Sequence, residues 1–227
     1  MTPHEYRIEV ASNGSVTSRH FPAPGAPGRA VLILAHGAGA DQRHRFMTGA
    51  AAALASRGVD VVTFNFLYTE QRHRSPDRAP LLEQTWTAVV DAVAARVPDA
   101  RLVVGGKSMG GRIASQVLAA RPDSPAWSRV SGLVLLGYPL HPPGRPEQPR
   151  TSHLPAITAP ILLVQGTRDA FGTRDEIEPI FSALPTRVDF EYVEGGDHSF
   201  AVPKSSGRSA GDVMTAIYDR VAGWILG

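Results

Sequence analysis

The sequence predicts an α/β fold in which helices cover both faces of a mostly parallel central sheet. Short apolar runs alternate with helical stretches through most of the 227 residues, and this alternation is typical of parallel strands joined by crossover helices. The runs contain few polar residues, as strands buried on both faces do. A chain of this length can bury one large core, so we expect a single domain over residues 1–227.

Eight strands are expected, each a short apolar or alternating run. The first two flank Asn13-Gly14, a dipeptide that favours a hairpin. A Pro- and Gly-rich connection over residues 22–28 leads to the third run, AVLILA, which is apolar throughout. In chain order the strands cover residues 6–10, 16–21, 30–35, 59–64, 101–105, 133–137, 161–165 and 188–193.

Five helices are expected between and after these strands. The first is Ala-rich and closed by Gly58, and the second carries apolar residues three or four apart before Pro98. In chain order the helices cover residues 46–57, 80–97, 110–120, 173–184 and 210–226. Sites in such sheets form at the carboxyl ends of the strands, which is therefore where functional residues are expected.

The composition excludes several classes of function. A net charge of +2 does not favour nucleic acid or an anionic membrane as a partner. The chain has no cysteine, which excludes disulfides, thiolate metal sites and a cysteine nucleophile. It shows no secretory signal and no apolar run near the ~18 residues of a membrane span, so we expect a cytoplasmic protein. Its histidines lack metal-binding spacing, and no metal is expected. The sequence does not predict an oligomeric state.

The strongest motif is Gly106-Lys107-Ser108-Met109-Gly110, a G-x-S-x-G between an expected strand and an expected helix. This context is that of a nucleophile elbow, in which the serine occupies a strained turn that only small neighbours permit. The dipole at the start of the following helix favours negative charge developing there. We therefore predict Ser108 as a nucleophile.

The same segment contains Gly-Lys-Ser, which also occurs in phosphate-binding P-loops. A P-loop needs a further glycine five positions before the Gly of Gly-Lys. Arg101 occupies that position, inside the expected strand. The segment therefore lacks the loop of backbone N–H groups that would bind a phosphate.

A serine nucleophile needs a base, and in this fold class the chain order is serine, acid, histidine. His198 follows the last expected strand and is the only histidine after residue 153. Asp169 follows the strand ILLVQ and is the predicted acid, which orients the imidazole. Asp197 is adjacent to the histidine and is expected to brace its loop. The other nearby acids lie in the next expected helix and are worse placed; they are Asp175, Glu176 and Glu178.

Two backbone N–H groups are needed to hold an oxyanion. Met109, the residue after the serine, should supply one. The loop after AVLILA should supply the other, from Ala38 or else Gly39. His36 begins this loop and is expected to shape it by hydrogen bonding.

Five motifs together resemble the KANL/Tex-like branch of the α/β-hydrolase superfamily and, more distantly, the dienelactone hydrolases. They are HGAGAD (36–41), GGKSMGGR (105–112), GYP (137–139), QGTRDAFG (165–172) and GGDHSF (195–200). The resemblance covers the chain from about residue 29 onward and implies the α/β-hydrolase fold, a triad of Ser108, Asp169 and His198, no cofactor and no metal. Dienelactone hydrolases use a cysteine where this chain has Ser108, which argues against that particular activity.

Residues 138–160 contain seven prolines and no helical periodicity, so no cap domain is expected and the site should be open. The loops around it should place Tyr138, Leu140, Phe171 and Phe200 against a substrate.

Two basic runs, at residues 43–45 and 72–74, follow strand ends, and Arg112 lies one turn into the elbow helix. They are interpreted first as solvated surface. Alternatively Arg43 and Arg112 bind an anionic substrate.

The predicted activity is hydrolysis of a carboxylic ester, a small-molecule substrate, through an acyl-serine intermediate. Thioester hydrolysis or acyl transfer by the same residues is an alternative. A further alternative is a non-catalytic interaction module. Such a module would have no need for all three triad residues.

Overall fold

The computed structural model describes residues 2–25 and 30–227, and its strands form one sheet in the order β1-β2-β4-β3-β5-β6-β7-β8. In chain order the strands are β1 His4–Glu9, β2 Ser15–Phe21, β3 Ala30–Ala35, β4 Asp60–Phe64, β5 Arg101–Lys107, β6 Val130–Leu136, β7 Ile161–Gly166 and β8 Val188–Val193. Strand β2 pairs antiparallel with both β1 and β4. The remaining neighbours in the sheet, from β4 through β3 to β8, pair parallel. The predicted fold class is confirmed.

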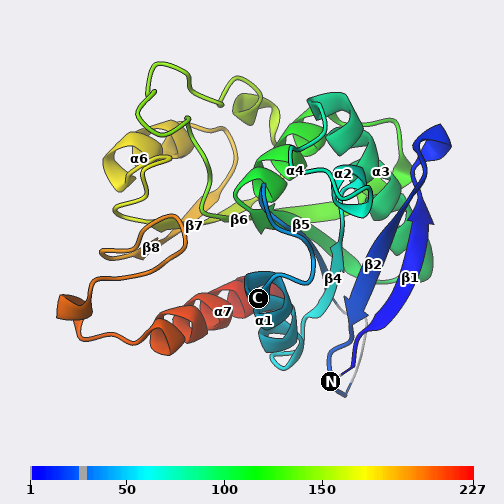
Figure 1. The fold of residues 1–227 in the computed structure, drawn as a ribbon, viewed down its shortest axis with the longest axis horizontal. Coiled ribbons are helices and arrows are strands. Elements are labelled where there is room, and N and C mark those ends of the chain that lie inside the picture. Colours follow the sequence, from blue (N-terminus) through cyan, green and yellow to red (C-terminus); the bar gives the residue numbers. More distant parts are fainter. Residues whose placement is uncertain (1, 26–29) are drawn as a thin grey trace.

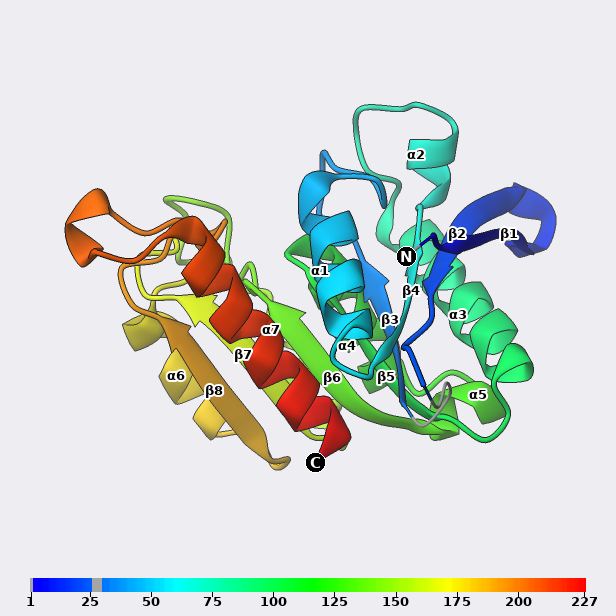
Figure 2. The ribbon, with the colours of Figure 1, turned by 90° about the horizontal axis from the view of Figure 1, so that it is seen from below.

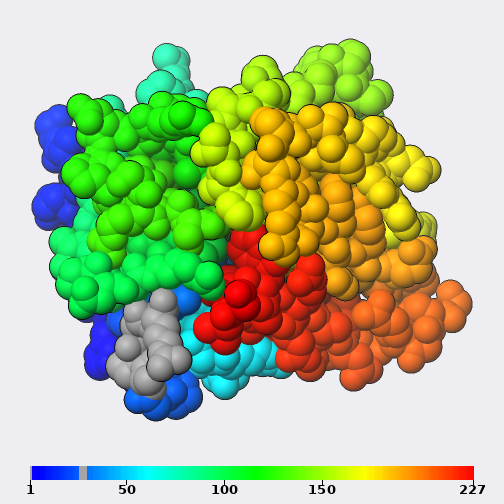
Figure 3. Space-filling view, turned by 180° about the vertical axis from the view of Figure 1, so that it is seen from behind, coloured from blue at the N-terminus to red at the C-terminus, as the bar shows by residue number. Residues whose placement is uncertain are grey.

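Helices cover both faces of the sheet (Figures 1 and 2). Helices α1 (Arg45–Ala55) and α7 (Ala210–Leu226) lie side by side on one face. The other face carries α3 (Ala79–Arg96), α4 (Met109–Ala120) and α6 (Arg174–Ser182). Figure 3 shows α7 from behind, where it lies beside the segment that contains β8.

The two helical layers enclose two separate apolar cores, and β3 contributes to both. Its residues Val31, Ile33 and Ala35 pack with α3 and α4, whereas the residues between them pack with α1 and α7. All six residues of β3 are buried. This explains why AVLILA has no polar alternation: each side chain of a central parallel strand faces one core or the other.

The differences from the predicted elements are small and have local causes. The four-residue helices α2 (Leu67–Glu70) and α5 (Pro125–Ser128) were not predicted, because four residues show no periodicity. Strand β5 extends two residues beyond its predicted end, to Lys107, so that the nucleophile follows it immediately. The predicted connection over residues 22–28 lies partly outside the described residues.

The segment from residue 137 to 160 carries no cap. Its one regular element is the single 3-10 turn Leu154–Ala156. The carboxyl edge of the sheet therefore stays uncovered on this side. Across residues 2–25 and 30–227, none of the helices combines the length and the apolarity that crossing a membrane requires.

Candidate active site

Ser108 lies in the sharp turn between β5 and α4, with backbone angles φ 52° and ψ −119°. A side chain rarely adopts this conformation, and such strain concentrates at functional positions. Glycines make the turn possible. A Cβ on Gly106 would lie 2.5 Å from the backbone of Gly110, and one on Gly110 would lie 2.5 Å from the carbonyl oxygen of Ala35. The motif thus folds as the sequence predicts.

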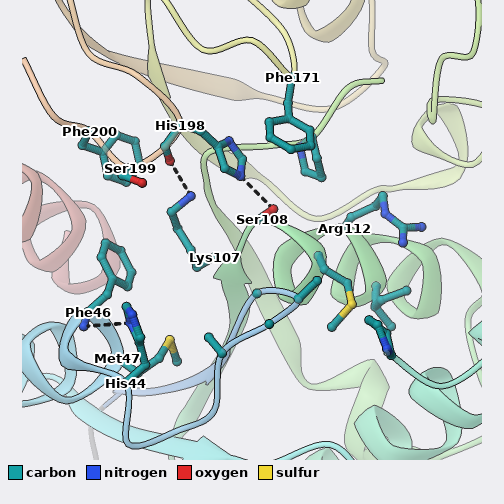
Figure 4. A pocket seen from close by; sticks show the side chains of 18 of the residues that line it. His44, Phe46, Met47, Lys107, Ser108, Arg112, Phe171, His198, Ser199 and Phe200 are labelled. Atoms are coloured by element: carbon teal, nitrogen blue, oxygen red, sulfur yellow. Dashed lines mark hydrogen bonds between the residues drawn. The ribbon is translucent and has the colours of Figure 1, made fainter. Parts of the chain in front are cut away.

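Hydrogen bonds join Ser108, His198 and Asp169 in one chain, and Figure 4 shows the bond between Ser108 and His198. The Ser108 hydroxyl lies 2.8 Å from Nε2 of His198, and Nδ1 of His198 lies 2.7 Å from Oδ2 of Asp169. Asp169 follows β7 and His198 follows β8, so all three residues stand at the carboxyl edge of the sheet. The structure brings these predicted residues together at distances that permit proton transfer from the serine to the histidine.

Asp169 is fully buried, yet its carboxylate is well supplied with hydrogen bonds. The Phe171 N–H donates to Oδ1 at 2.8 Å, and the side-chain amide of Gln165 donates to Oδ2 at 2.9 Å. The imidazole N–H of His198 adds a third donor. A buried carboxylate needs such partners, and these three donors supply them.

The other acids considered in the sequence have different partners. Asp197 accepts hydrogen bonds from the backbone N–H groups of Ser199 and Ala201, which shapes the turn that carries His198. Glu176 caps α6 at Thr173, and Glu178 pairs with an arginine on the same helix. Asp175 lies in the first turn of α6.

The loop after β3 lies against the elbow. Ala38, Gly39 and Met109 line the same cavity as Ser108, and a Cβ on Gly37 would lie 3.4 Å from the Cβ of Ser108. Met109 is the first residue of α4, where backbone N–H groups have no partner within the helix. The predicted oxyanion donors are therefore gathered around the serine.

His36 lies beneath this loop and is fully buried. Its Nδ1–H donates to the carbonyl of Gly37 at 2.9 Å, and its Nε2 accepts from the N–H of Phe66 at 3.4 Å. Burial lowers the pKa of the His36 imidazole, which keeps it neutral. The structure thus places it as a support of the loop, as predicted.

The site opens into a cavity of about 980 Å³ that extends to both sides of Ser108. On one side Phe46 and Met47 of α1 meet Phe200 and α7 (Figure 4). On the other side Arg112 extends from α4. Phe171 covers the histidine, with its ring centroid 4.3 Å from that of His198. A serine between two arms suits a substrate whose two halves flank the reacting bond.

Three of the residues predicted to bind substrate do not line this cavity. Tyr138 is buried, and its hydroxyl donates to the carbonyl of Arg150. Leu140 is also buried, against Gly172. Arg43 turns toward the N-terminal hairpin, where its guanidinium pairs with Glu5 at 2.8 Å. The sequence predicted correctly where these loops lie, but not the directions of their side chains. Phe171, Phe200 and Arg112 do line the cavity.

Lys107 is a site residue that the sequence did not predict. Its ammonium donates to the carbonyl oxygen of His198 at 2.6 Å and lies 5.3 Å from the ring centroid of Phe200. Burial lowers the pKa of Lys107 to about 8. Lys107 therefore ties the elbow to the loop that carries the histidine. The only sequence signal was a lysine, a residue rarely buried, directly before the nucleophile.

Comparison with known proteins agrees with this geometry. Residues 28–226 match the family described as an alpha/beta hydrolase domain. A dienelactone hydrolase from Anabaena variabilis superposes with a TM-score of 0.75 at 20% identity, over 100% of this chain and 98% of that one. The superfamily and the distant likeness to dienelactone hydrolases are thereby confirmed.

Two further solved structures have the same fold. An alpha-beta serine hydrolase homologue from Coxiella burnetii gives a TM-score of 0.76 at 20% identity, over 97% of each chain. A protein from Xanthomonas campestris, described as a serine hydrolase without lid, gives 0.75 at 20% identity over 100% of this chain and 97% of that one.

Proposed function

Because the chain belongs to the α/β-hydrolase family, we propose that it is a serine hydrolase that cleaves a carboxylic ester through an acyl-serine intermediate. One observation carries the proposal. The Ser108 hydroxyl is hydrogen-bonded to His198, which is in turn hydrogen-bonded to the buried carboxylate of Asp169, and the serine faces an open cavity. Nucleophile, base and orienting acid are the three parts that acyl transfer by a serine needs.

In the first half of the reaction, Oγ of Ser108 attacks the acyl carbon while Nε2 of His198 takes the hydroxyl proton. The resulting oxyanion is held by the N–H groups of Met109 and Ala38. Asp169 stabilises the positively charged imidazole without taking its proton. The C–O bond of the ester then breaks, and the alcohol leaves with the proton that His198 returns.

In the second half, water attacks the acyl-serine and gives a proton to His198. The tetrahedral species collapses, the proton returns to Ser108, and the carboxylic acid is released. Thioester hydrolysis and acyl transfer would use the same steps with another leaving group or another acceptor. Hydrolysis is favoured over acyl transfer because the uncapped cavity is open to water.

A fluorophosphonate probe tests the proposal, since it reacts with activated serines only. We expect it to label Ser108, and Ser108→Ala to abolish both labelling and hydrolysis of p-nitrophenyl esters. Asp169→Asn should lower kcat by several powers of ten, because the amide presents the wrong imidazole tautomer. Asp197→Asn is the matched control and should retain most of the activity. Labelling of another serine would show that Ser108 is not the nucleophile, and no labelling at all would support a non-catalytic module.

A further inference from the structure

Two arginines from different parts of the chain line the arm of the cavity beyond Ser108. Arg112 lies one turn into α4, and its backbone N–H donates to the carbonyl of Ser108 at 3.0 Å. Arg150 comes from the segment between β6 and β7. Burial lowers the pKa of Arg112, and the positive charge of the neighbouring Arg150 lowers it further.

Both residues are held in place by the surrounding structure. The backbone of Arg150 is held, because its N–H donates to the carbonyl of Leu140 at 2.7 Å and its carbonyl accepts from the Tyr138 hydroxyl at 2.6 Å. Nη1 of its side chain donates to the carbonyl of Pro139 at 3.5 Å. Arg112 is fixed by the helix and by a hydrogen bond from Nη1 to the side chain of Gln116 at 3.1 Å. Side chains that already have hydrogen-bond partners lose less conformational freedom when they bind a ligand.

In the described residues no carboxylate lies at ion-pair distance from either arginine, although the charge of Glu83 in α3 acts on Arg112 from farther away. Within residues 2–25 and 30–227, neither arginine forms an ion pair, and Nε of Arg112 is buried without a hydrogen-bond partner. Asp77 also lines the cavity, where its carboxylate accepts the N–H of Tyr68 and forms no ion pair with Arg112 or Arg150. Two adjacent like charges repel each other, so the native arrangement has an electrostatic cost that an anion would remove.

We propose that Arg112 and Arg150 form a subsite for an anionic group of the substrate, a carboxylate or a phosphate, beside the ester bond that Ser108 attacks. The inference rests on the function proposed above and narrows it to esters that carry a negative charge. Guanidiniums recognise both oxyanions through paired N–H donors. The opposite arm, around Phe46 and Met47, offers apolar contact to the other half of the substrate.

Matched ester pairs test the subsite and distinguish its possible ligands. For a carboxylate, p-nitrophenyl monoesters of glutarate, adipate and pimelate are compared with the p-nitrophenyl alkanoates of equal chain length. For a phosphate on the alcohol half, acetyl glycerol 3-phosphate is compared with monoacetyl glycerol. At low salt we expect kcat/KM to be about 10- to 100-fold higher for at least one anionic ester than for its neutral partner. This preference should shrink as salt is added.

Two variants locate the effect. Arg112→Gln and Arg150→Gln should each remove most of the anionic preference while leaving hydrolysis of the neutral ester within about threefold. Two variants are used so that a folding defect in one of them, detected by circular dichroism, does not end the test. Arg121→Gln is the matched control, because Arg121 is exposed at the far end of the same helix, and it should keep the preference.

The outcomes separate this inference from the proposed function. If Ser108 hydrolyses neutral esters but no anionic ester is favoured, or if the variants keep the preference, the subsite is disproved and the hydrolase remains. If no ester is hydrolysed, calorimetry with glutarate and with inorganic phosphate decides. Binding that Arg112→Gln abolishes would support the subsite, and no binding at millimolar concentration would overturn it.

Discussion

At the scale of single residues, the site depends on how a few side chains are held rather than on which residues are present. Ser108, His198 and Asp169 were predictable because each has a recognisable place after a strand. Lys107 was not predictable in its role. Its partner is a backbone carbonyl at residue 198, and no local pattern reports a contact over that sequence distance.

The Lys107 contact leads to a prediction about pH. Above its pKa of about 8 the amine loses its charge, so its hydrogen bond to the carbonyl of His198 weakens. We expect kcat/KM of the wild type to fall as pH rises past 8. Lys107→Met should be about tenfold less active at pH 7, with no such fall. Lys204→Met, a change of an exposed lysine, is the control and should follow the wild-type profile.

The free energy of unfolding should change with pH in the opposite direction to the activity. This difference distinguishes a loss of His198 positioning from a loss of folded protein. The pKa of Lys107 is lower in the folded protein than its ordinary value near 10.5, so between these values the unfolded chain binds more protons. The free energy of unfolding of the wild type, relative to Lys107→Met, should therefore rise from pH 8 to 10.5. A parallel fall of activity and stability in urea titrations would contradict a positioning role.

At the scale of elements, the strand–turn–helix around Ser108 has the least tolerance for added atoms. Gly106→Ala would place a methyl group 2.5 Å from the backbone of Gly110, and backbone cannot move aside as a side chain can. We expect the free energy of unfolding to fall by about 1–3 kcal/mol or more, as in overpacked cores, with loss of fluorophosphonate labelling. Urea denaturation followed by circular dichroism measures the change.

Gly223 provides the comparison for this substitution. It lies in α7, exposed, with nothing within 4 Å of the position that a Cβ would occupy. Gly223→Ala should raise the free energy of unfolding by up to about 1 kcal/mol, since alanine favours a helix over glycine. Equal destabilisation by the two substitutions would show that the turn around Ser108 tolerates an added methyl group as well as an exposed helix position does.

At this scale the sequence predicted types of element better than side-chain directions. The buried strands follow from their apolar runs, and the long helices from their periodicity and terminal residues. The loops carry no such pattern. Tyr138 and Leu140 turn into the core, and Arg43 turns toward Glu5, because hydrogen bonds and an ion pair with distant segments fix them.

At the scale of the whole molecule, the missing cap determines how substrate arrives. The described chain from residue 137 to 160 contains only one 3-10 turn, and the cavity beside it is open. A lid that opened at a lipid surface would make the rate rise sharply once the substrate forms droplets or micelles, since opening would then limit turnover. No element between β6 and β7 offers such a lid.

We therefore expect the rate of p-nitrophenyl butyrate hydrolysis to follow simple saturation through the solubility limit of the ester, with no increase when droplets form. A second measurement uses detergent micelles, which should leave kcat unchanged or lower the rate by sequestering the ester. A stepwise rise in rate at the solubility limit would show that another segment covers the site in solution. Because α1 and α7 form the apolar wall beside Phe46 and Phe200, they would be the first elements to probe by hydrogen exchange in that case.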